Sequence, residues 1–187
     1  GCNDNYVYKN DFSYAPTNGV EITFSKNKII ENIINECDHG IWGGYSWNTS
    51  ITGNRFYKNR IGIAIEHGQY NNISNNTFES NKLAAVKLWA RKTQPSDWGY
   101  ANKRETRSMQ YNFWENHFKN EQVAFDMTLT QDIVLYKNKF ENTKTQIKKD
   151  SLVKQLNIDP TQIVDSTSSV PQIIKNWKQV SIPVTNF

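Results

Sequence analysis

The sequence of 187 residues is poor in the features that define several large classes of protein. Its two cysteines, Cys2 and Cys37, are too few for a disulfide framework. No apolar stretch approaches 18 residues, so we expect no membrane span, and no basic-then-apolar leader is present. The 22 basic and 18 acidic residues are spread without a long run of one sign. We therefore expect no dedicated nucleic-acid surface.

Helical periodicity is scarce before residue 148, and a repeat takes its place. An asparagine recurs every 22 residues, and a large apolar residue follows it by two positions. The asparagines are Asn10, Asn32, Asn54, Asn76, Asn116 and Asn138, and the apolar residues are Phe12, Ile34, Phe56, Phe78, Phe118 and Phe140. A second polar corner follows at Asn59 and Asn81, one residue earlier at Asn120 and Asn142, and at Cys37 as the exception. Stacked asparagines of this kind satisfy backbone groups inside bends that water cannot enter.

Farther along each repeat, a small residue precedes an alternation of apolar and polar residues. The rows are Gly19–Ile22, Gly40–Gly43, Gly62–Ile65, Ala85–Leu88 and Ala124–Met127. Alternation with a period of two predicts a strand that faces the core with one side only. Because parallel strands in a doubly wound fold need crossover helices, the lack of helices favours a solenoid. We predict an all-β parallel β-helix of about six coils of 22 residues.

The runs from Asn54 to Ile63 and from Asn76 to Asn81 resemble the repeats of right-handed parallel β-helix proteins. They are similar to pectate-lyase-like proteins, to carbohydrate-binding and sugar-hydrolase repeats, and to NosD-type periplasmic proteins. The resemblance covers roughly residues 5 to 145 and rests on scaffold positions. It implies a right-handed solenoid.

The repeat breaks between Asn76 and Asn116, which are 40 residues apart. We predict a loop at about 90–109, inserted in a β-helix that spans 1–147. Residues 148–158 carry Leu152, Val153 and Leu156 at helical spacing, so we predict a short capping helix there. Residues 148–187 would then form this helix and an extended tail. Nothing in the sequence covers the first coil, which predicts either further domains of a longer chain or a partner at that end.

Aligning the rungs predicts columns of outward side chains on one face. One column contains Glu21, Trp42, Ala64, Lys87 and Asp126, a second contains Thr23, Gly44, Glu66, Trp89 and Thr128, and a third contains Phe24, Tyr45 and His67, with Trp47 nearby. Aromatic rings stack on the C–H faces of sugars, while polar groups bind the hydroxyls. The predicted saccharide-binding residues are Trp42, Tyr45, Trp47 and Trp89 on the coils and Arg91, Trp98, Tyr100 and Arg104 in the insertion. The alternative is that the tryptophans pack beneath the insertion as a satellite core.

The predicted catalytic candidates on this face are Glu66, His67, Lys87 and Asp126. Glu66 and Asp126 lie two coils apart, roughly 10 Å by strand spacing, which suits an inverting glycoside hydrolase. Alternatively, Lys87 or His67 would remove a proton from a uronate in a polysaccharide lyase. The paired aspartates of many β-helix enzymes are missing, however, and Lys87 and Asp126 equally suit a salt bridge.

No metal site or cofactor is predicted. The NosD resemblance suggests copper, but His39, His67 and His117 fall in three different columns, and no glycine loop suited to phosphate is present. The leading hypothesis is a secreted, cell-surface or periplasmic protein that binds a polysaccharide or oligosaccharide, with turnover left open. The runner-up is a structural or adhesive solenoid module. An open groove at Glu66 and Asp126 would favour an enzyme, whereas Trp98 or Tyr100 in that groove would favour the module.

Overall fold

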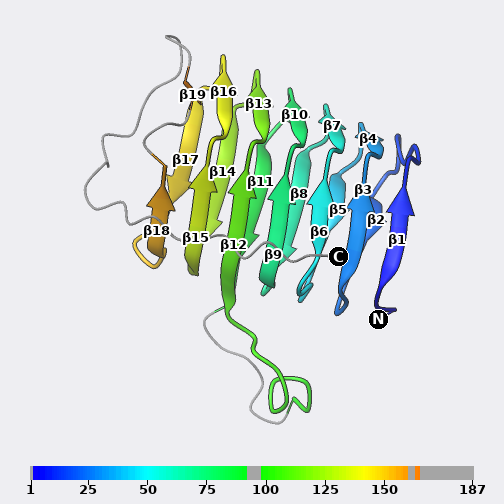
Figure 1. Ribbon diagram of the computed structural model, residues 1–187, viewed down its shortest axis with the longest axis vertical. Helices are drawn as coiled ribbons and strands as arrows, with labels where there is room; N and C mark the ends of the chain where they lie inside the picture. Colours follow the sequence, from blue (N-terminus) through cyan, green and yellow to red (C-terminus); the bar gives the residue numbers. More distant parts are fainter. Residues whose placement is uncertain (1, 92–97, 160–162, 165–187) are drawn as a thin grey trace.

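The computed structural model describes residues 2–91, 98–159 and 163–164. The regular structure of these residues consists of strands, which form three parallel sheets wound into one solenoid (Figure 1). Sheet A contains β1 (Asn5–Tyr8), β3 (Asn27–Ile30), β6 (Ser50–Thr52), β9 (Gln69–Ser74), β12 (Ser108–Trp114), β15 (Thr130–Tyr136) and β18 (Lys154–Ile158). Sheet B contains β4 (Ile33–Asn35), β7 (Arg55–Tyr57), β10 (Thr77–Glu79), β13 (His117–Lys119), β16 (Lys139–Glu141) and β19 (Ile163–Val164). Sheet C contains β2 (Asn18–Glu21), β5 (His39–Trp42), β8 (Ile61–Glu66), β11 (Ala84–Trp89), β14 (Val123–Thr128) and β17 (Thr145–Lys149).

Each coil passes through sheets A, B and C in turn, and the next coil begins again in sheet A. Pairing follows the predicted repeat, since Phe78 pairs with Phe56 and, across the insertion, with Phe118. Sheet A has seven strands, so the solenoid has about seven turns, one more than the sequence indicated. The parallel β-helix prediction is confirmed.

The core is built from inward residues that repeat from coil to coil. Phe56, Phe78, Phe118 and Phe140 are all fully buried and stack along sheet B, with ring centroids 4.8 to 5.2 Å apart. This separation matches the spacing of neighbouring strands, so one aromatic residue per coil makes a continuous column. Burial of such a side chain stabilises the fold by roughly 1.5–3 kcal/mol.

The corner between sheets A and B contains the predicted asparagine ladder. Oδ1 of Asn76 accepts hydrogen bonds from the backbone N–H and from Nδ2 of Asn54, at 2.8 and 3.0 Å. Nδ2 of Asn54 also donates to the carbonyl of Ile29 at 2.8 Å. The residue before each ladder asparagine has a positive φ, as at Glu31 (54°) and Gly53 (68°). This left-handed residue turns the chain, and the asparagine satisfies the polar groups that the turn buries.

The second corner, between sheets B and C, corrects one detail of the sequence pattern. Asn120 and Asn142 are not ladder residues, because they occupy the left-handed turn position, with φ of 54° and 47°. The ladder position after Asn81 is filled by Glu121, whose Oε1 accepts from Nδ2 of Asn81 at 2.8 Å. Thr143 follows it and donates to the carbonyl of Phe118 at 3.3 Å. Asparagine tolerates a positive φ well, which explains the apparent shift of the motif by one residue.

The insertion lies close to its predicted place, between the end of β11 at Trp89 and the start of β12 at Ser108. Residues 108 and 109 belong to the strand, since Met109 pairs with Gln69. The 40-residue spacing also includes one extra residue before β11, where Ala84 pairs with Ile61. In Figure 1 the described part of the insertion projects from the lower end of β12, away from the stack.

The capping helix predicted at 148–158 is wrong. The chain completes β17 at Lys149, turns, and enters β18 at Lys154. Leu156 pairs with Ile133, so it is an inward residue of sheet A, and Leu152 lies in the turn before the strand. A turn followed by a strand therefore produced an apolar spacing that imitates a helix. Of the predicted tail, Ile163–Val164 form β19 beside β16, whereas Pro160, Pro171 and Pro183 lie outside the described residues.

Candidate functional site

The outward columns predicted on sheet C are present. Trp42 pairs with Ala64, Ala64 with Lys87, and Lys87 with Asp126, so these side chains follow one another along the solenoid. Glu66 and Trp89 are neighbours in the next column. The sheet fixes these positions because its inward residues, among them Ile63, Val86 and Phe125, are completely buried.

Trp42 and Trp89 come together although they belong to different columns and to strands β5 and β11. Their ring centroids are 5.5 Å apart and their planes are inclined by 56°. Both side chains are half-buried, over the small outward residue Ala64 of the intervening strand β8. Gly44 makes room for the first indole, because a Cβ there would lie 3.3 Å from Nε1 of Trp42. The two rings form a partly exposed aromatic surface that we call the tryptophan pair.

Glu66 supports the tryptophan pair from one side. Its Oε1 accepts a hydrogen bond from Nε1 of Trp89 at 3.1 Å and another from Nε of Arg91 at 2.8 Å. The Glu66 side chain is only 12% exposed, whereas the Arg91 side chain is 75% exposed. Glu66 therefore orients the indole and anchors the first residues of the insertion.

His67 is withdrawn from the surface, with 1% of its area exposed. Its Nε2 accepts the backbone N–H of Arg91 at 3.0 Å, so the proton resides on Nδ1, which donates to the carbonyl of Thr106. Burial lowers its pKa, which favours this neutral tautomer. His67 thus ties the outgoing and returning ends of the insertion to the solenoid, and both of its nitrogens are occupied. Gln69 adds a bond from Nε2 to the carbonyl of Arg107 at 2.8 Å.

The third predicted column is an aromatic stack that the insertion contacts. Tyr45 stacks on Phe24 with centroids 4.8 Å apart and on His67 at 4.7 Å. Trp98 and Tyr100 meet Tyr45 edge-on, at 5.1 and 5.6 Å. Burial raises the pKa of Tyr100, consistent with its packed position. The satellite core therefore exists, but it is built from this column and not from the tryptophan pair.

Lys87 and Asp126 are paired with neighbours that the sequence analysis did not assign. Nζ of Lys87 lies over the Trp89 ring, 5.3 Å from its centroid. Asp126 receives Nζ of Lys148 at 3.3 Å from the next coil, which extends the column. Glu66 and Asp126 therefore belong to separate ion pairs.

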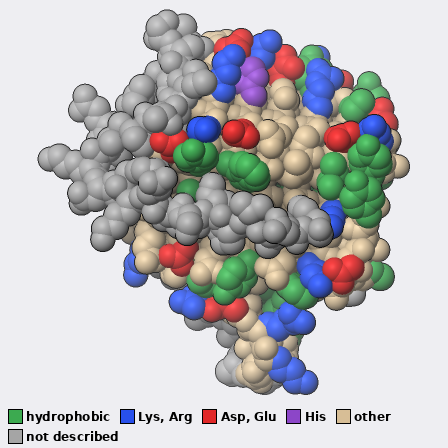
Figure 2. All heavy atoms as spheres, in the orientation of Figure 1, with side chains coloured by type: hydrophobic (Ala, Val, Ile, Leu, Met, Phe, Trp, Pro, Cys, Tyr) green, Lys and Arg blue, Asp and Glu red, His purple; other side chains and the backbone are tan. Residues whose placement is uncertain are grey.

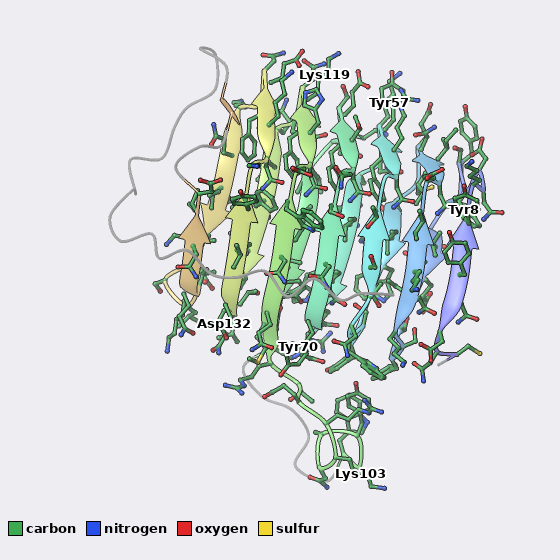
Figure 3. All side chains as sticks on the ribbon, viewed as in Figure 1. Tyr8, Tyr57, Tyr70, Lys103, Lys119 and Asp132 are labelled. Atoms are coloured by element: carbon green, nitrogen blue, oxygen red, sulfur yellow. The ribbon has the colours of Figure 1, made fainter. Side chains whose placement is uncertain are left out.

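Trp47 of the coil and Arg104 of the insertion also meet. The guanidinium carbon of Arg104 lies 4.6 Å from the Trp47 ring centroid, and Nζ of Lys26 lies 5.6 Å from it. Figure 3 places Lys103 at the tip of the projecting loop and Tyr70 near its base. This contact fastens the insertion to the coil at a second point, apart from sheet C.

Sequence reasoning missed a polar cluster beside Trp42. The His39 ring lies 5.2 Å from the Trp42 ring, and its Nε2 is 3.0 Å from a guanidinium nitrogen of Arg60. Arg60 also pairs with Asp38, while Nδ1 of His39 is 3.1 Å from Oδ1 of Asn18. Burial lowers the pKa of His39. The signal was available, since Arg60 follows Asp38 by one repeat of 22 residues, but positions 38, 39 and 60 precede the rows from Gly40 and Gly62 that were aligned.

Within the described residues, no three His, Cys, Asp or Glu side chains gather in a way that would hold a metal ion. The same part of the chain contains no helix with the length and apolar character needed to cross a membrane.

The geometry defines the class: a three-sheet parallel β-helix with an aromatic and ionic surface on one outer face. A family model described as the right-handed beta helix region matches residues 1–163. The chain belongs to this family. No curated protein and no solved structure matched this chain.

Proposed function

We propose that the protein is a saccharide-binding β-helix module that holds a sugar chain on the outer face of sheet C without cleaving it. The observation that carries this proposal is the tryptophan pair, whose rings are partly exposed and lie 5.5 Å apart on a rigid sheet. Aromatic faces of this size bind the apolar faces of pyranose rings, and a flat sheet suits an extended polymer.

The surroundings of the pair supply the polar part of such a site. Lys87, Asp126 and the His39 to Arg60 cluster border the rings and offer donors and acceptors for sugar hydroxyls. Trp89 is held by Glu66, so its orientation is set before a ligand arrives. A site organised in this way loses little side-chain entropy on binding.

Binding without turnover fits the contacts of Glu66 and His67, two of the four catalytic candidates. Oε1 of Glu66 is engaged by Trp89 and Arg91, and His67 is buried with both ring nitrogens bonded. A general acid or base must reach the reacting group of the substrate, and these two side chains are directed to the insertion instead. For a ligand of the cell-wall or matrix kind, the proposal carries with it a secreted, cell-surface or periplasmic location.

Calorimetry of the full chain against neutral and acidic oligosaccharides tests the proposal. We expect Trp42→Ala and Trp89→Ala to weaken binding by about 0.5–1.5 kcal/mol each, roughly 2- to 10-fold, through loss of an aromatic contact. Tyr57→Ala is the matched control, since Figure 3 places this aromatic residue on sheet B, at a distance from sheet C.

Three results would count against the proposal. Equal affinity in the parent and both tryptophan variants would remove the face from consideration, and no affinity for any glycan would favour the structural module. Release of reducing ends or of unsaturated products from a bound polysaccharide would show turnover and contradict the non-catalytic part.

A further inference from the structure

A cavity of about 250 Å³ lies where the insertion leaves and rejoins the solenoid. Its walls come from the outgoing end of the insertion at 90–91, from the returning end at 106–107, and from the two coils that follow, at 129–131 and at Leu152 and Lys154. Because a cavity of about 150 Å³ can hold benzene, this space accommodates an oxyanion together with part of a sugar ring. The tryptophan pair takes no part in its walls.

Three cationic side chains share these walls. Arg91, Arg107 and Lys154 line the cavity, and among the described residues that line it none is an aspartate or a glutamate. They belong to three separate segments of the chain, so the fold brings their charges to one space. In Figure 2, Lys and Arg side chains lie along the lower edge of the molecule, where the insertion leaves the stack. The charge of the walls favours an anion.

The nearby carboxylates engage only part of each arginine. Nε of Arg91 donates to Oε1 of Glu66 at 2.8 Å, and Arg107 donates to Oε2 of Glu105 from Nε at 3.0 Å and from Nη2 at 2.6 Å. A guanidinium has five N–H donors, so each arginine keeps donors for a ligand. Within the described residues, Nζ of Lys154 has no ion pair.

The backbone that carries the two arginines is fixed before any ligand arrives. Nε2 of His67 accepts the backbone N–H of Arg91 at 3.0 Å. Nε2 of Gln69 donates to the carbonyl of Arg107 at 2.8 Å. His67 itself lines the cavity and is 1% exposed, so a buried polar side chain forms part of its wall. A site organised in this way loses little entropy on binding.

A second wall is fixed by the turn between β17 and β18. Oδ1 of Asp150 accepts the N–H groups of Leu129 and Leu152, at 3.3 and 3.0 Å. Lys154 then pairs with Gln131 where β18 joins β15, so sheet A sets its position. The two leucines line the cavity as well, and they offer an apolar surface to the carbon part of a ligand.

We propose that this cavity binds a small organic molecule through a phosphate or sulfate ester, with Arg91, Arg107 and Lys154 as the anion-binding groups. A tetrahedral ester group presents three terminal oxygens and can meet donors from three segments, whereas a planar carboxylate has two. Arginine binds such oxygens as a fork, and lysine binds them as a point charge. This cavity is separate from the tryptophan pair, so its test is independent of the proposed function.

Titration of the full chain with glucose 6-phosphate and with glucose 6-sulfate, followed by NMR of the leucine methyl groups, tests the proposal. We expect saturable shifts at Leu129 and Leu152, which line the cavity. Leu83, which is 53% exposed and lies outside the cavity, should not shift. Glucose and glucuronate should bind at least about 10-fold more weakly than the better ester. The ester that binds more tightly identifies the anion.

Two variants of equal charge change locate the site. Lys154→Gln should weaken binding of the better ester by at least about 5-fold, because it removes one of the three cations. Lys103→Gln, at the tip of the projecting loop in Figure 3, is the matched control and should leave the affinity within about 2-fold of the parent. The proposal is overturned by an equal loss in both variants, by glucose or glucuronate binding as tightly as the esters, or by unmoved Leu129 and Leu152 signals with both esters up to about 10 mM.

Discussion

Glu121 is the buried residue whose chemistry fits its position least well. It occupies a ladder position that asparagines fill in the two preceding coils, and its surface is 1% exposed. Oε1 accepts from Asn81, but Oε2 is buried without a hydrogen-bond partner in the described structure. Burial raises the pKa of Glu121 from its ordinary 4.5 to about 8. At neutral pH the folded protein therefore holds a neutral carboxyl group that acts as an asparagine substitute.

The raised pKa of Glu121 makes stability depend on pH with a defined sign. Between about pH 4.5 and 8, the folded chain retains a proton that the unfolded chain has lost. The contribution of this group is complete below pH 4.5 and declines as the pH rises to about 8. Glu121→Gln keeps the acceptor for Asn81 and removes the ionisation, so it should be the more stable protein above pH 8, by on the order of 1–3 kcal/mol.

Denaturant unfolding of parent and variant from pH 4 to 9 checks this expectation. The difference between the two proteins isolates Glu121 from the histidines, which titrate in both. A difference that stays constant across this range would show that Glu121 is ionised in the folded protein.

The insertion is the element that departs most from the repeat, and it is attached at several points. His67 and Gln69 hold its ends, while Trp98 and Tyr100 pack on the aromatic stack of Phe24 and Tyr45. Near its return, two hydrogen bonds from Arg107 lower the pKa of Glu105 to about 2. The described part of the insertion is therefore a folded flap whose attachment does not involve the tryptophan pair.

Removing one attachment should loosen the flap and leave the solenoid intact. Trp98→Ala loses ring contacts of the kind worth about 0.5–1.5 kcal/mol, so protease cleavage within 98–107 should accelerate roughly 2- to 10-fold. The melting temperature of the β-helix should change little, because the core column of Phe56 to Phe140 is untouched. Lys103→Ala at the loop tip is the control, and cleavage of Trp98→Ala at the parent rate would show that these ring contacts do not hold the loop.

Across the whole chain, the sequence was most informative at positions where every coil needs the same kind of residue for stacking. The Asn54 ladder, the Phe78 column and the outward position of Trp42 each follow from the 22-residue spacing, since stacking brings equivalent residues together. The prediction of local structure failed where one sequence pattern was compatible with two different structures. Leu152 to Leu156 fitted a helix as well as a turn and strand, and Asn120 fitted a ladder as well as a left-handed turn.

The sequence predicted which side chains of the candidate site share a column, but it did not predict which of them contact one another. Register alone placed Glu66 beside Trp89, yet it gave no indication that His67 points into the base of the insertion. The contact of Trp98 with Tyr45 depends on how the insertion folds back onto the coils. A non-repeating segment has no periodicity from which that path can be inferred.

The most direct test of saccharide binding by sheet C is the NMR response of the tryptophan indole N–H signals during titration with the best oligosaccharide ligand. Among the described tryptophans, the account predicts saturable shifts for Trp42 and Trp89, with an unchanged Trp47 signal serving as the internal reference on the insertion contact. When Trp42→Ala removes half of the pair, the Trp89 shift should saturate at a ligand concentration roughly 2- to 10-fold higher. Shifts confined to Trp47, or a titration that leaves the signals of both Trp42 and Trp89 unmoved while ligand binds, would contradict the account.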